Sequence, residues 1–367
     1  MDRRFSDPVI VSLSSAFFSM GFFALTFSFP LFADKLHYNA GFIGFLGIFA
    51  GIPFPVFAYL MTRFGGKTLL SSLKISMIIM IPIVIIFILF SGIFFIPLVI
   101  LSDLAGAAFY VSVELGIGNT DSPNLAERYS VAWGIPNLVS PAIAGAVLEG
   151  LGYRDLFILS LVFFLVSMIF IPMRGLEIRD NNVSQKGSFS IYLIMPMLFG
   201  GLSAGFFFYV MIPYLRLTGF SYILIGIIGA VPPFFSATAF IVLNRIRSEN
   251  WKTYATASAL LLSTPLALFF SQSILTVGMV FAMGGFGSAI AFSKGLSYIS
   301  RGSTPSVGVF YYETLFGIGF ILGSLFGGLI FDYFKFVAVI AIFLPSLIYS
   351  IAVMSRGLGK PLHTNEQ

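Results

Sequence analysis

Cysteine is absent from this sequence, which excludes disulfides, thiolate metal ligands and cysteine nucleophiles. Histidine occurs only at His37 and His363, far apart in the chain, so we expect no histidine-based metal site. Charged residues make up only 10% of the chain, whereas soluble domains carry about 25%. The sequence therefore excludes an ordinary soluble domain, and we expect neither a metal nor a cofactor.

Apolar residues are abundant instead: they make up 58% of the chain, which includes 45 phenylalanines, and the mean hydropathy is +0.99. A protein of this composition is solvated by lipid. The net charge of +5 then indicates orientation in a membrane and not nucleic-acid binding. We expect a monomeric, all-α integral membrane protein whose surroundings are the lipid bilayer.

Runs of apolar sequence set the number of spans, because a helix needs roughly 20 such residues to cross the hydrocarbon core. Inside lipid the backbone groups must pair within their own segment, so each span is expected to be a helix. The sequence predicts twelve spans: 8–33, 36–62, two within 75–116 that part at Ser91-Gly92, 129–148, 156–173, 189–215, 220–244, two within 253–293 that part at 271–273, 306–331 and 336–355.

The most polar interior stretch divides these spans into two groups of six. We expect an N-terminal half at 1–173, a cytoplasmic linker at 174–188, a C-terminal half at 189–355 and a cytoplasmic tail at 356–367. Three positions recur 183 residues later in the other half: Gly134 and Gly317, Gly145 and Gly328, Glu149 and Asp332. Such repeats are typical of transporters with a binding site between two related halves.

The positions of Lys and Arg predict the orientation, since cytoplasmic loops carry an excess of them. With the N-terminus in the cytoplasm, only Lys35, Arg154, Arg216 and Lys335 fall outside. The other 16 of the 20 cations fall inside: Arg3, Arg4, Arg63, Lys67, Lys74, Arg128, Arg174, Arg179, Lys186, Arg245, Arg247, Lys252, Lys294, Arg301, Arg356 and Lys360. We therefore expect a multi-pass protein of the cell membrane with both termini cytoplasmic.

Two segments, AYLMTRFGGK at 58–67 and the stretch at 133–157, resemble the major facilitator superfamily of transporters. The turn AYLMTRFGGK at 58–67 is similar to the family's Gly-x-Leu-Ala-Asp-Arg-x-Gly-Arg-Arg loop through Leu60, Arg63, Gly65 and Lys67, with Thr62 at the acidic position. The segment at 133–157 resembles the family's fifth helix. The resemblance implies a major facilitator-like fold of two six-helix halves, and transport by alternating access.

Span four contains the acid with the strongest functional indication. Asp103 lies near its middle, and a carboxylate at the bilayer centre costs about 2.5–3.5 kcal/mol on insertion scales. Burial favours the protonated form, which suits a proton-coupling residue; the alternative is an acid bonded to a neighbouring hydroxyl. Tyr110 and Glu114 share a helical stripe with Asp103, with Glu114 about 16 Å nearer the cytoplasm. A sugar site would need several polar and aromatic groups, for which Asn137, Tyr209, Tyr214 and Gln272 are candidates, and Asn137 is also expected at the substrate cavity.

Two other groups of residues have predicted structural roles. If the family fold holds, a cytoplasmic gate of salt bridges joins Glu114 and Glu313 to cations, although solvated interfacial charges are the alternative; the expected gate residues are Arg63, Lys67, Arg128, Lys294 and Glu313. Small or helix-bending residues permit close helix packing; these are Pro141, Gly145, Gly319, Gly323 and Gly327.

The function predicted from these features is secondary active transport of a small solute by alternating access. We expect coupling to protons and export of apolar or cationic molecules, because the cavity is rich in aromatic residues and poor in charge. Uptake of a sugar or other neutral metabolite is one alternative. A transporter-derived receptor or scaffold is another, and no catalytic constellation supports an enzyme.

Overall fold

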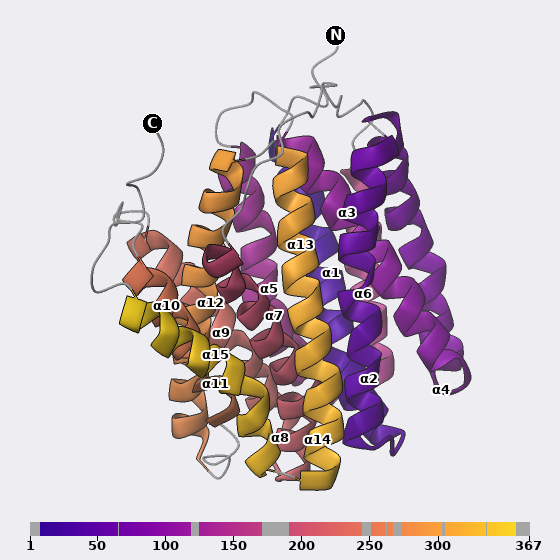
Figure 1. The fold of residues 1–367 in the computed structure, drawn as a ribbon. Helices are drawn as coiled ribbons and strands as arrows, with labels where there is room; N and C mark the ends of the chain where they lie inside the picture. The colour runs from indigo at the N-terminus through magenta and orange to yellow at the C-terminus, as the bar shows by residue number, and fades with distance from the viewer. Residues whose placement is uncertain are drawn as a thin grey trace.

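The computed structural model describes residues 8–64, 66–118, 125–170, 191–243, 251–261, 263–266, 273–302, 305–334 and 336–356, and every element in these ranges is helical (Figure 1). The earlier elements are α1 (Pro8–Lys35), α2 (Ala40–Gly51), α3 (Pro53–Phe64), α4 (Gly66–Gly118), α5 (Leu125–Gly150) and α6 (Tyr153–Ile169). The later ones are α7 (Ile191–Phe206), the π-helical η1 (Phe207–Met211), α8 (Ile212–Leu217), α9 (Tyr222–Leu243), α10 (Trp251–Leu261), α11 (Ser263–Leu266), α12 (Ile274–Gly302), α13 (Pro305–Ile321), the π-helical η2 (Leu322–Phe326), α14 (Gly327–Phe334) and α15 (Phe336–Arg356).

Within the described residues, nine helical segments are long and apolar enough to cross a membrane. They are Val9–Lys35, Ala40–Met61, Ser71–Phe90, Gly92–Gly116, Val131–Gly150, Met195–Leu217, Tyr222–Ala239, Ile274–Phe292 and Phe310–Phe334. The other three predicted spans coincide with α6, with α10 and α11, and with α15, whose described portions do not meet both conditions. The chain is thus a multi-pass membrane protein, and the total of twelve spans stays a prediction.

The two interruptions within apparent spans have local causes. In α4 the backbone leaves helical geometry at Phe90, with φ −141° and ψ 30°, which confirms the turn predicted at Ser91-Gly92. Between α2 and α3, Pro53 has no backbone N–H to continue the helical ladder. The two short helices nevertheless form one continuous apolar span.

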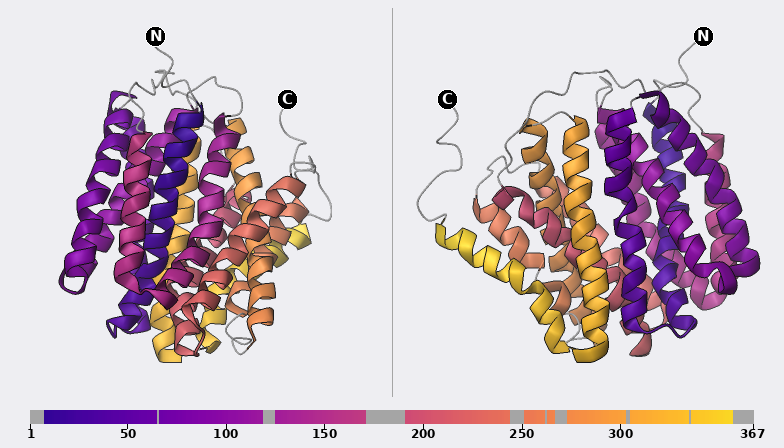
Figure 2. Two further views of the ribbon diagram at one scale, coloured as in Figure 1. Left: turned by 180° about the vertical axis from the view of Figure 1, so that it is seen from behind. Right: turned by 45° about the vertical axis from the view of Figure 1, so that its right-hand side comes forward.

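Helices distant in sequence lie side by side. α1 packs on α5 and α6, and α5 also packs on α9. On another side, α2 and α3 lie against α13 and α14, as the right-hand view of Figure 2 shows. The predicted linker at 174–188 and the tail beyond residue 356 lie outside the described residues, and the division into halves stays a prediction.

Large apolar side chains cover the outside of the bundle, while aromatic rings fill its interior. Ile93 is 82% exposed and Ile169 is 77% exposed. Exposing these apolar side chains to water would be unfavourable, whereas lipid solvates them. Inside, Phe18 is fully buried and stacks on Phe109 with ring centroids 3.7 Å apart. The exposed surface therefore belongs in hydrocarbon.

Candidate functional site

Among the described residues, Asp103 is the most deeply buried acid. It lies in the middle of the span Gly92–Gly116 and is 2% exposed. Its Oδ2 atom has no hydrogen-bond partner among the described residues. The neighbouring hydroxyl of Ser102 donates instead to the Val99 carbonyl oxygen at 2.9 Å. Since a buried polar atom without a partner is costly, Asp103 is available to a proton or a solute.

Tyr209 approaches Asp103 from the other part of the sequence. It lies in η1, is 3% exposed, and experiences an electrostatic effect of the Asp103 carboxylate. Its ring packs edge-on against Phe320, with centroids 5.8 Å apart. A Cβ atom built on Gly47 would lie 3.3 Å from the Tyr209 ring and would overlap the side chain of Ser324. Residues of α2, α4, η1, α13 and η2 thus converge at the centre, and π-helical turns such as η1 and η2 are frequent at functional sites.

An aromatic cluster adjoins this centre on the same face of α4. Tyr110 is 7% exposed and donates a hydrogen bond to the Ser19 hydroxyl at 2.9 Å. Several phenylalanine rings surround it, including Phe22 at 5.5 Å and Phe54 at 6.3 Å between centroids. The arrangement offers aromatic faces and one buried acid, which suits a cation or an apolar solute. Asn137 lies half-buried on α5, and no described residue hydrogen-bonds to its amide.

Two acids, one near the end of α4 and one in the first half of α13, interact with each other. Glu313 is 6% exposed, and its side chain forms a hydrogen bond with that of Glu114. The Tyr129 hydroxyl also donates to Glu114 Oε1 at 3.5 Å. A hydrogen bond between two carboxyl groups requires that one of them carry a proton. The α4–α13 contact therefore depends on protonation.

The cations expected in a salt-bridge gate cannot be compared with this pair, because their side chains lie outside the described part of the structure. Arg63, Lys67, Arg128 and Lys294 are in helical backbone segments, and nothing further is described for them. The sequence predicts that Glu114 and Glu313 each form salt bridges with cations. The described contact is between the two carboxyl groups themselves.

The glycine repeat runs from α13 through η2 to the start of α14 and packs on α7 and η1. Cβ atoms at Gly319 and Gly323 would overlap backbone atoms of Leu198 and Leu202, and one at Gly327 would press on Phe206. These close approaches are possible only because the glycines have no side chain. The repeat thus serves close helix packing.

At the lower end of the bundle in Figure 1, which holds the α1–α2 turn at 36–39, α5 contacts α9 through an acid and a glycine pair. Glu149 Oε2 accepts a hydrogen bond from the backbone N–H of Tyr222 at 2.7 Å, at the start of α9. One turn deeper, Gly145 lies against Gly226, and a Cβ on either would overlap backbone of the other helix. Pro141 continues this interface, because its carbonyl oxygen abuts Gly226. We name these residues the α5–α9 contact.

A second contact of the same construction joins α14 to α2. Asp332 accepts hydrogen bonds from the backbone N–H groups of Gly41 at 2.7 Å and Ala40 at 3.2 Å, at the start of α2. Gly328 lies against Gly44. We name these residues the α14–α2 contact, and the two together the capping contacts.

The capping contacts are related by the internal repeat. Glu149 and Asp332 are 183 residues apart, and so are Gly145 and Gly328. In each contact an acid faces the positive end of a helix dipole, an arrangement that stabilises the charge. The sequence revealed the matching positions but not their partners, because the partners are backbone N–H groups that carry no residue-type signal.

No model of a protein family and no curated protein matches this sequence. Solved structures match it through their fold. A bacterial homologue of the human lysosomal transporter Spinster, in an inward-facing and occupied conformation, is 15% identical with a TM-score of 0.69, and the alignment covers 96% of each chain.

Two further solved structures share the arrangement. A POT family transporter in complex with 5-aminolevulinic acid is 11% identical with a TM-score of 0.72 and 95% coverage of both chains. The nucleoside transporter NupG is 17% identical with a TM-score of 0.66, covering 94% of this chain and 98% of that one. The chain therefore has the fold of the major facilitator transporters, as the sequence resemblance implied.

Proposed function

We propose that this protein is a proton-coupled secondary transporter that exports apolar or cationic small molecules by alternating access. The observation that carries the proposal is Asp103, a deeply buried acid whose Oδ2 atom has no hydrogen-bond partner among the described residues. Gain or loss of a proton there changes the charge at the centre of the bundle, and ionisable groups within membranes are typically functional. The fold shared with known transporters supports the transport part of this proposal.

In the proposed cycle, the two ends of the helix bundle close alternately. The capping contacts hold the lower end closed, and we assign that end to the outside of the cell from the distribution of Lys and Arg. The Glu114–Glu313 contact joins α4 to α13 nearer the cytoplasm. A solute bound near Asp103 and Tyr110 meets aromatic rings and one acid, which favours cationic or apolar molecules over phosphorylated or acidic ones.

The test measures solute and proton movement in liposomes containing a pH-sensitive dye. The panel includes lipophilic cations, sugars, organic acids, nucleosides and 5-aminolevulinic acid. Wild type is compared with Asp103→Asn, and Asp155→Asn serves as the control because that half-buried acid lies in the first turn of α6, away from the centre. Proton movement with a cationic or apolar solute, abolished only by Asp103→Asn, is the expected result.

The other outcomes separate the alternatives. Solute exchange without proton movement overturns the coupling role of Asp103 and leaves a uniporter or a transporter that uses another ion. Saturable uptake of a sugar or another neutral metabolite would identify the protein as an uptake transporter instead of an exporter. If no solute in the panel moves across the membrane, the result supports a receptor or scaffold.

A further inference from the structure

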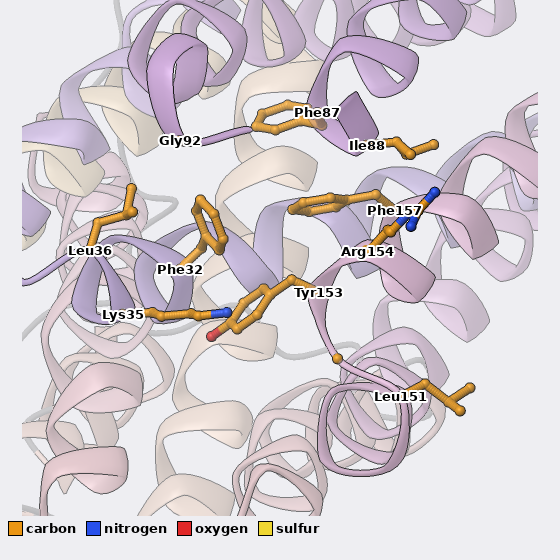
Figure 3. A pocket seen from close by; sticks show the side chains of 11 residues that line it. Phe32, Lys35, Leu36, Phe87, Ile88, Gly92, Leu151, Tyr153, Arg154 and Phe157 are labelled. Carbon is orange, nitrogen blue, oxygen red and sulfur yellow. The ribbon is translucent and has the colours of Figure 1, made fainter. Parts of the chain in front are cut away.

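A cavity of about 510 Å³ opens at the lower end, where α1 ends, α4 kinks and α6 begins (Figure 3). Its apolar wall consists of the rings of Phe32, Phe87 and Phe157. Lys35 and Arg154 also line it, and Figure 3 shows Lys35 reaching toward Tyr153 while Arg154 lies beside Phe157. The cavity is remote from Asp103 and is not used in the proposed transport cycle.

Two cationic side chains, Lys35 and Arg154, line this cavity. Lys35 Nζ lies 4.9 Å from the centroid of the Tyr153 ring, and neither Lys35 nor Arg154 forms an ion pair with any carboxylate in the described part of the chain. The adjacent Asp34 interacts electrostatically with Arg216 and His37 instead. The cavity therefore combines aromatic walls with two cationic side chains that form no ion pair among the described residues, while the nearest acids are Asp34, next to Lys35, and Asp155, in the first turn of α6.

Backbone groups add to the positive potential. Gly152 is the N-cap residue of α6 and provides no side chain to accept from the first N–H groups of that helix. Those groups form the positive end of the helix dipole. An anion at this position would gain both the helix terminus and the two cationic side chains.

The surface around the cavity is apolar and exposed. Ile93, beside the kink in α4, is 82% exposed, and Leu151, in the turn before α6, is 69% exposed. A membrane covers such a surface. A ligand that reaches the cavity therefore comes from the lipid phase, and complementarity requires that it carry a negative headgroup and a hydrocarbon chain.

We propose that this cavity binds an anionic phospholipid. Its phosphate group lies near Lys35, Arg154 and the start of α6, and part of an acyl chain packs against Phe32 and Phe157. Charge-assisted hydrogen bonds to phosphate supply the preference for an anionic headgroup. This site is independent of the transported solute, so it stands whether or not the proposed function is correct.

The first experiment measures retained lipid by native mass spectrometry. Purified protein is equilibrated with equal amounts of phosphatidylglycerol and phosphatidylcholine, and the bound species are counted as detergent is exchanged. Wild type is expected to retain phosphatidylglycerol preferentially, and Lys35→Gln/Arg154→Gln is expected to reduce that preference by about fivefold or more. Lys74→Gln, which removes a half-buried charge on α4 outside the cavity, is the control.

A second variant tests the cavity while leaving the charges in place. Gly92 lines the cavity, and a Cβ added to it meets no heavy atom within 4 Å. Gly92→Leu is therefore expected to fold and to displace the acyl chain. Gly278→Leu is the matched control, because a Cβ on Gly278 also meets nothing within 4 Å but lies on α12.

Three results would overturn the proposal. Equal retention of both lipids by wild type removes the headgroup preference. Unchanged retention in Lys35→Gln/Arg154→Gln or in Gly92→Leu, relative to its control, places the lipid elsewhere. Complete displacement by water-soluble glycerol phosphate identifies the ligand as a free phosphate ester and not a membrane lipid.

Discussion

Removing the carboxylates of Glu149 and Asp332 is expected to shift the protein toward states in which its lower end is open. At a helix start, Glu149 accepts one backbone hydrogen bond of 2.7 Å, and Asp332 accepts two, of 2.7 and 3.2 Å. Loss of such a cap costs about 0.5–2 kcal/mol. Taking about 1 kcal/mol for each contact, Glu149→Ala or Asp332→Ala changes the ratio of closed to open states about fivefold, and the double variant about 30-fold. The two effects should add because the contacts share no residue.

The absence of cysteine makes the measurement direct, since introduced thiols are the only sites for labels. Leu151→Cys and Leu217→Cys place labels in the α5–α6 turn and at the end of α8, where the native side chains are 69% and 68% exposed. Distances between the labels, measured by electron paramagnetic resonance or single-molecule fluorescence, report the closed and open populations. Glu149→Gln, which keeps an oxygen but loses the charge, should give an intermediate shift.

Asp155→Ala is the control for nonspecific loss of charge. Asp155 lies at the same end, in the first turn of α6, and takes part in neither capping contact. The reasoning is refuted if Glu149→Ala/Asp332→Ala leaves the distance distribution unchanged in folded protein. A shift of equal size in Asp155→Ala refutes it as well.

The remaining predictions use adjacent or equivalent positions as controls. Gly201→Ala should lower the melting temperature in detergent because its Cβ would overlap backbone of α13, at a cost of about 1–3 kcal/mol, whereas Gly200→Ala, with open space, should not; equal melting temperatures contradict this. Gly145→Ala should open the lower end in the distance assay and Gly134→Ala should not, since only the first Cβ meets α9. Glu313→Gln provides an amide donor in place of the shared proton. In wild type, the α4–α13 distance should widen as the pH rises and the proton between Glu114 and Glu313 is lost. In Glu313→Gln the distance should not change with pH, and a pH response equal to that of wild type speaks against the shared proton.

Much of the fold could be predicted from the sequence because a membrane imposes simple rules. Apolar run length and backbone hydrogen bonding placed the helices, and the turn between spans three and four fell within one residue of the break at Phe90. The burial of Asp103 followed from its position in the middle of an apolar run. These features depend only on local composition.

The arrangement around the central acid could not be predicted in the same way. Tyr209 was one of several aromatic candidates, and nothing in its local sequence marks the π-helical turn that carries it. The pairing of Glu114 with Glu313 was also unexpected, because two acids are ordinarily assigned to cationic partners. Such contacts depend on how distant helices approach, which composition does not determine.

The α14–α2 contact also has a consequence for biosynthesis. The start of α2 receives its acceptor from Asp332, 292 residues after Ala40. While the chain is being synthesised, this helix end has no such partner until α14 has emerged and packed. Closure of this end is thus expected late in assembly, and a chain that stops before residue 332 should insert its early helices but leave the N–H groups of Ala40 and Gly41 without this acceptor, while Asn39 still caps Phe42.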